Sequence, residues 1–99
     1  MEVLVMDRLN VLFFSFYRED LDVQAAIAPI ARAKIYRVMG TIHIECLDEI
    51  HLAQVIPIIK YLIMPIGLLR LGRNIVVHCP DFPSFYYLVK VQKTKNLHV

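Results

Sequence analysis

Two cysteines and four histidines are the side chains of this chain best suited to nucleophilic or metal chemistry. The sharpest arrangement is His78-Cys79, which ends an apolar run. A thiolate can attack phosphorus when converging backbone N–H groups and an arginine surround the phosphate. The residues that follow, 80–84, contain no glycine and no arginine, and Pro80 and Pro83 have no N–H to donate. The arrangement therefore indicates a buried structural cysteine rather than a catalytic one.

A metal site would have to draw on the remaining histidines and cysteines together. Neighbouring residues of a strand point to opposite faces, so His78 and Cys79 diverge, and His43 and Cys46 diverge for the same reason. Cys46 with His51 across a strand–helix corner is the one conceivable pair. We therefore predict no metal site, no cofactor and no catalytic residues.

Recognition of nucleic acid is an alternative chemistry. Single-stranded nucleic acid is bound by aromatic rings that stack on bases and by basic groups that contact phosphates. Residues 1–49 carry eight acids and five bases, whereas residues 50–99 carry six bases and one acid. The net charge is only +2, so the overall attraction to a polyanion is modest. This alternative would use Arg70, Arg73, Lys90, Lys93 and Lys95.

Composition indicates association more strongly than it indicates chemistry. Ile, Leu and Val supply 35 of the 99 residues, whereas Ser, Thr, Asn and Gln together supply ten. So short a chain buries only about two-thirds of the surface that its unfolded form exposes. We therefore predict a non-enzymatic binding or assembly module that forms a homodimer or meets another protein. The predicted interface residues are Phe82, Phe85, Tyr86, Tyr87, Val89, Ile63 and Ile66.

Strands and helices must position these residues, and the first half of the chain predicts both. Residues 3–6 and 11–17 are apolar or aromatic runs that favour two strands, the second of them central. Asp20 is expected to cap a helix that runs through residues 23–33. Pro29 should kink that helix or split it, because proline removes a helical hydrogen bond.

The middle of the chain alternates apolar and polar residues over 34–47, which is typical of a strand with one covered face. Gly40 marks either a bulge or a tight reversal into a second strand. Asp48 should cap a second helix, which Pro57 and Pro65 interrupt. Beyond a turn at residues 72–74, two further strands are expected.

These two final strands cover residues 75–79 and 85–91 and complete an α+β two-layer sandwich. The predicted sheet is antiparallel, has about four to five strands, and carries two helices on one face. If Gly40 is a reversal, a ferredoxin-like βαββαβ order results. Residues 1–92 should form the single domain, and residues 93–99 a flexible basic tail.

The start of the chain carries Glu2 and Asp7, where a signal peptide needs basic residues. We therefore expect a cytoplasmic protein whose cysteines stay reduced. The apolar residues 55–71 include two prolines and the charged Lys60 and Arg70, so no transmembrane segment is predicted.

In composition the chain resembles small orphan proteins from viruses of hot-spring archaea, which are short, rich in Ile and Tyr, and poor in motifs. The likeness covers composition and no motif. It implies a viral accessory protein of the host cytoplasm. Scarce polar amides and hydroxyls also suit a thermostable protein.

Overall fold

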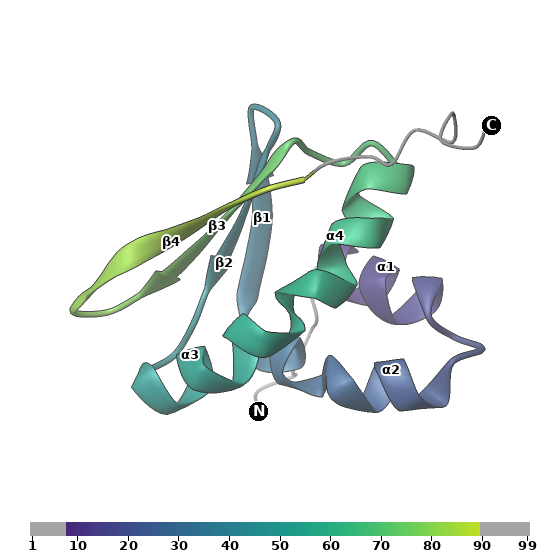
Figure 1. Cartoon of the computed structure of the whole chain (residues 1–99), viewed down its shortest axis with the longest axis horizontal. Helices are drawn as coiled ribbons and strands as arrows, with labels where there is room; N and C mark the ends of the chain where they lie inside the picture. The colour runs from purple at the N-terminus through teal and green to yellow at the C-terminus, as the bar shows by residue number, and fades with distance from the viewer. Residues whose placement is uncertain (1–7, 90–99) are drawn as a thin grey trace, which may run out of the picture.

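The computed structural model describes residues 8–89, which form an α+β fold of two layers. A four-stranded sheet makes one layer and the helices make the other (Figure 1). This confirms the predicted fold class. Residues 3–6, predicted as a strand, and 93–99, predicted as a tail, lie outside the described residues. The elements are α1 (Arg8–Phe16), α2 (Leu21–Ala26), the 3₁₀ turn η1 (Ala28–Arg32), β1 (Lys34–Val38), β2 (Thr41–Glu45), α3 (Glu49–Val55), the 3₁₀ turn η2 (Ile56–Ile58), α4 (Ile59–Leu68), β3 (Asn74–Cys79) and β4 (Phe82–Leu88).

Residues 11–17, predicted as a central strand, lie mostly in α1, so that prediction was wrong. The inward positions recur at helical spacing: Asn10 and Phe13 are buried, and Tyr17 packs against the core. Strand preference of aromatic residues is weak, and tertiary packing overrides it here. The Asn10 side-chain amide donates to the backbone oxygen of Ile30 at 2.7 Å, which fixes α1 against η1.

Both predicted helix caps are confirmed. The backbone N–H of Val23 donates to Asp20 Oδ1 at 3.2 Å, and that of His51 donates to Asp48 Oδ1 at 2.8 Å. The first predicted helix splits as expected, because Pro29 lies in the first turn of η1 rather than inside α2. Local sequence therefore determines where these helical segments begin.

The second helical stretch contains two prolines, and they act differently. Pro57 lies in the first turn of η2, whereas Pro65 lies inside α4. Pro65 has no N–H to donate to the carbonyl of Tyr61, the acceptor four residues earlier. The Tyr17 hydroxyl donates to this carbonyl at 2.7 Å. A hydrogen bond from α1 thus replaces the one that the proline removes.

Together α3, η2 and α4 form the stretch Glu49–Leu68, which is long and apolar enough to cross a membrane by those two criteria. Half of an apolar 18-residue window within it is buried inside the fold. The core helix of a globular protein meets the same criteria, so length and composition alone are weak support for a span.

The sheet has the order β1-β2-β3-β4 and is mixed. Gly40 is a reversal: Met39 and Gly40 both have positive φ, 50° and 82°, as a two-residue hairpin turn of type I′ requires. β3 and β4 are also antiparallel, but β2 and β3 are parallel because the α3–α4 connection crosses between them. The sheet therefore differs from the predicted wholly antiparallel one. With a helix in place of the first strand, the order is not ferredoxin-like.

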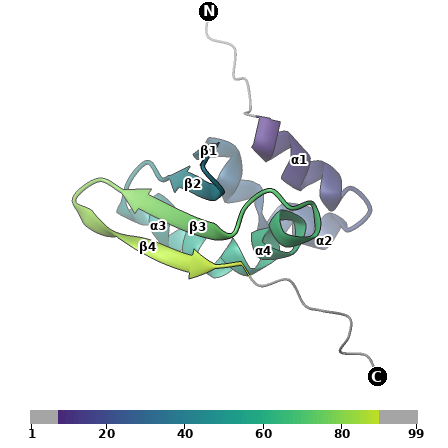
Figure 2. The same cartoon turned by 90° about the horizontal axis from the view of Figure 1, so that it is seen from above.

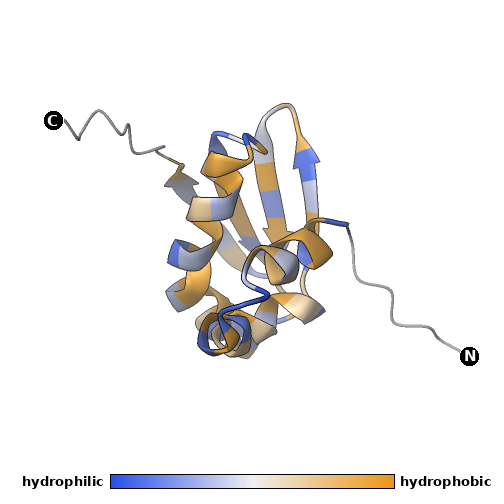
Figure 3. Ribbon diagram, turned by 90° about the vertical axis from the view of Figure 1, so that its right-hand side faces the viewer, coloured by the Kyte–Doolittle hydropathy of each residue, from blue (hydrophilic) through white to orange (hydrophobic). Residues whose placement is uncertain are grey.

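The core lies between the sheet and the helices. Apolar residues dominate the elements of both layers (Figure 3). Phe13, Leu62 and Ile66 are fully buried on the helical side. The sheet contributes the buried side chains Ile35, Ile42, Ile44, Ile75 and Val77.

Candidate functional site

β4 is an edge strand and carries most of the residues predicted for an interface. Four of its seven residues are exposed large hydrophobic side chains, and Tyr86 is the most exposed of them at 75%. Figures 1 and 2 show that the β3–β4 hairpin projects away from α1 and α4. The four side chains are Phe82, Phe85, Tyr86 and Leu88.

The other predicted interface residues are less available. Tyr87, Val89 and Ile63 are half-buried and pack against the core, and burial raises the pKa of the Tyr87 hydroxyl. Ile66 is fully buried in the core and offers no surface to a partner, so it leaves the predicted interface. An apolar residue gives the same sequence pattern whether its helix packs into the core or binds a partner, so the sequence could not distinguish the two.

The backbone of β4 has one satisfied edge and one open edge. The N–H of Val89 donates to the oxygen of Arg73 at 2.9 Å, toward β3. Backbone groups alternate in direction along a strand, so those of Tyr86 and Leu88 point away from β3. No other strand among residues 8–89 pairs with this outer edge.

A row of polar side chains crosses the sheet face opposite the helices. The Tyr36 hydroxyl of β1 donates to Glu45 Oε2 at 2.7 Å, and this bond raises the pKa of Tyr36. The Tyr36 ring stacks on that of His43, with centroids 5.0 Å apart. His43 Nδ1 lies 2.9 Å from His78 Nε2, and His78 Nδ1 lies 3.0 Å from Ser84 Oγ. The row therefore links all four strands.

In the hydrogen bond between His43 and His78, one of these two ring nitrogens donates its N–H and the other accepts. The sequence did not predict this contact, because it depends on the parallel register of β2 and β3. In that register His43 lies opposite Val76, two residues before His78. His43 occupies an outward position of the alternating strand β2, and His78 interrupts the otherwise apolar run 75–79, which was the available signal.

The other candidates for chemistry lie elsewhere and have structural roles. His51 is buried; its Nδ1 accepts from the N–H of Leu47 at 2.9 Å, and its Nε2 lies 2.8 Å from the oxygen of Pro29. The first bond leaves Nε2 as the donor of the second. In the part of the chain that the structure describes, no three potential metal ligands cluster.

Cys46 and Cys79 are unbridged and buried on the core side of the sheet. Burial raises the pKa of Cys46 to about 11 and also raises that of Cys79. Both thiols are therefore protonated at neutral pH, the opposite of what a nucleophilic cysteine needs.

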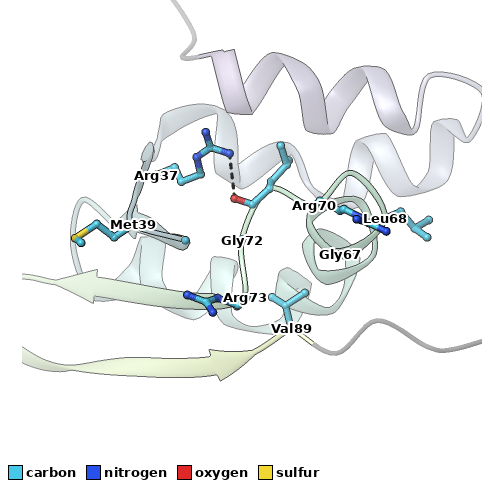
Figure 4. A pocket seen from close by; sticks show the side chains of 10 residues that line it. Arg37, Met39, Gly67, Leu68, Arg70, Gly72, Arg73 and Val89 are labelled. Atoms are coloured by element: carbon cyan, nitrogen blue, oxygen red, sulfur yellow. Dashed lines mark hydrogen bonds between the residues drawn. The ribbon is translucent and has the colours of Figure 1, made fainter.

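A hollow of about 860 Å³ lies where the β1–β2 turn, the end of α4 and the start of β3 meet (Figure 4). Arg70 and Arg73, two residues predicted for nucleic-acid binding, line it together with Arg37, which sequence reasoning did not single out. Lys90, Lys93 and Lys95 lie outside the described residues.

Two glycines form the close backbone contact at this hollow. The N–H of Arg73 donates to the oxygen of Gly40 at 2.7 Å. A Cβ atom at Gly72 would lie 2.9 Å from the same oxygen, so only glycine permits this approach. The short loop between α4 and β3 is thereby held against the β1–β2 turn.

No protein family model matches the chain, and no curated protein or solved structure shows a significant match. The described residues offer two candidate sites: the open edge of β4 and the hollow lined by three arginines.

Proposed function

We propose that this protein is a non-enzymatic binding and assembly module that forms a homodimer through the outer edges of two β4 strands. One observation supports this most strongly. On a single seven-residue strand, outward backbone groups that pair with no other strand of residues 8–89 occur together with four exposed large apolar side chains. Such an edge is a template for pairing with another chain.

A two-fold axis through Tyr87 makes the pairing self-complementary. Two antiparallel β4 strands then place Tyr86 of each copy opposite Leu88 of the other. The outward N–H and C=O groups of these residues form four hydrogen bonds between the copies. An isologous contact of this kind closes at two chains, so it gives a dimer rather than a fibre.

The side chains suit the same arrangement. Tyr86 and Leu88 share the open face of the sheet and are 75% and 68% exposed. In the paired strands each Tyr86 meets a Leu88 of the other copy, and aromatic–aliphatic cross-strand pairs stabilise a sheet. Phe85, 39% exposed on the opposite face, gains cover as well.

Sedimentation velocity of three proteins tests the proposal. The wild type should sediment as a dimer. Tyr86→Lys should sediment as a monomer, because it places like charges near each other across the paired edges. Ile50→Lys is the matched control: Ile50 lies on α3, is 73% exposed, and should leave the dimer intact. A monomeric wild type, or equal dimerisation of all three proteins, would contradict the proposal.

The alternative function, nucleic-acid binding by the basic half of the chain, has one specific observation in its favour. Arg70 and Arg73 line one hollow rather than lying apart on the surface.

A further inference from the structure

We propose that the hollow lined by Arg37, Arg70 and Arg73 binds the phosphate groups of an organic phosphate or of a nucleic-acid strand. The three arginines come from β1, from the end of α4 and from the residue before β3. No aspartate or glutamate is among the described residues that line the hollow. The hollow therefore gathers positive charge without a carboxylate to balance it.

Guanidinium groups are well matched to phosphate because their planar N–H forks bind two phosphate oxygens at once. Within residues 8–89 the Arg37 guanidinium makes one hydrogen bond, and it is long: 3.4 Å from Nη1 to the backbone oxygen of Leu71. Figure 4 shows Arg37 and Arg73 toward one side of the hollow and Arg70 beside Leu68 on the other.

The backbone conformation of Arg70 is a second observation in favour of the proposed site, independent of its charges. The N–H of Leu71 donates to the oxygen of Ile66 and that of Arg70 donates to the oxygen of Gly67, which is the Schellman pattern at the end of α4. In this pattern the residue at the Arg70 position is left-handed, and φ is 55° here. Glycine occupies such a position without strain, whereas arginine does not. Such strain occurs at ligand sites, so an arginine at a position that favours glycine supports a binding role for its side chain.

The other side chains that line the hollow indicate which chemical group accompanies the phosphate in the ligand. Met39, 92% exposed, and Leu68, 60% exposed, are apolar side chains beside the three charges. The volume of about 860 Å³ is within the range of sites that hold small organic molecules. A phosphate group attached to an apolar or aromatic moiety, such as a nucleoside, therefore fits better than inorganic phosphate.

Titration calorimetry at low salt tests the site with three probes: pyrophosphate, adenosine diphosphate and a short single-stranded oligonucleotide. The wild type should bind at least one of the last two more tightly than it binds pyrophosphate. Tight binding of the diphosphate but not the oligonucleotide identifies a free organic phosphate. Tight, steeply salt-dependent binding of the oligonucleotide identifies a nucleic-acid strand.

Three variants locate the binding. Arg70→Gly should weaken it about tenfold or more without lowering the unfolding temperature, because glycine relieves the left-handed strain. Arg37→Gln should weaken it similarly. Arg32→Gln removes an exposed arginine that bonds to Gln54, away from the hollow, and should leave affinity unchanged. The proposal is overturned if no probe binds, if pyrophosphate binds tightest, or if affinity is equal in all variants or falls equally in Arg32→Gln.

Discussion

The Tyr17 hydroxyl shows how one polar atom lets a proline remain inside a helix. It donates at 2.7 Å to the Tyr61 carbonyl, which Pro65 leaves without a helical donor. Burial raises the pKa of the hydroxyl, with Asp20 adding to the effect, so it stays protonated and able to donate. The proline and its compensating tyrosine are far apart in sequence, so their relation is visible only in the structure.

Tyr17→Phe should lower the free energy of unfolding by about 1–3 kcal/mol, because it leaves the Tyr61 carbonyl without a partner. Chemical denaturation measures the loss. In a Pro65→Ala background the same change should have a smaller effect, since Ala at this position can donate to Tyr61. Equal losses in the two backgrounds would show that the hydroxyl does not compensate for the proline.

Cys46 predicts a loss of stability at alkaline pH. Its pKa is raised from 9.0 to about 11 in the folded chain, first by burial and then by Cys79. Below about pH 9 the thiol is protonated in both the folded and the unfolded state, so its contribution to the free energy of unfolding is fully present. Above about pH 9 the thiol ionises in the unfolded state before it ionises in the folded state, and this stabilises the unfolded state. Unfolding free energy should therefore fall by about 1–2 kcal/mol between about pH 8 and pH 10.5 on account of this group.

The Cys46→Ala variant should lose less stability over the same pH interval. This comparison separates the effect of the Cys46 thiol from that of the tyrosines, which also titrate at alkaline pH. Alkylation at neutral pH gives a second readout: both cysteines should react only as fast as the protein opens. Rapid labelling of folded Cys79 would instead support a catalytic thiol.

At the scale of elements, features set by neighbouring residues could be predicted and those set by distant contacts could not. The caps Asp20 and Asp48 act on N–H groups three residues away, and both are present. α1 was missed because its inward face is defined by Asn10 and Phe13 packing on other elements. β2 pairs with β3 in parallel because the helices between them carry the chain back to the other end of the sheet. The alternation of apolar and polar residues within a strand does not indicate this path.

The β1–β2 turn offers a prediction of its own. Met39 has φ 50° and its side chain is 92% exposed, so its backbone is strained without a packing role. Met39→Asn creates Asn-Gly, the preferred pair for this turn, and should stabilise the fold by about 0.5–1 kcal/mol. Thermal and chemical denaturation measure it. Gly40→Ala, at φ 82°, should destabilise; a stabilised Gly40→Ala would mean that the turn is of another type.

For the whole molecule, composition indicated an apolar surplus but not where it lies. Sequence reasoning placed the interface on the aromatic strand or on the apolar helix. The structure puts Ile66 of α4 in the core and leaves Tyr86 and Leu88 of β4 exposed. The hollow itself was not predicted. Its residues Arg70 and Arg73 had been singled out by charge, whereas Arg37 is distant in sequence and lies in the half with more acids.

Amide hydrogen exchange along β4, followed by NMR at high and low protein concentration, tests the paired-edge dimer most directly. At high concentration the N–H groups of Tyr86 and Leu88 should be protected as well as those of Phe85 and Tyr87, which face β3. On dilution, or in Tyr86→Lys, protection should disappear at the outward positions and persist at Phe85 and Tyr87. Fast exchange of Tyr86 and Leu88 at every concentration, beside slow exchange of their neighbours, would contradict pairing through this edge.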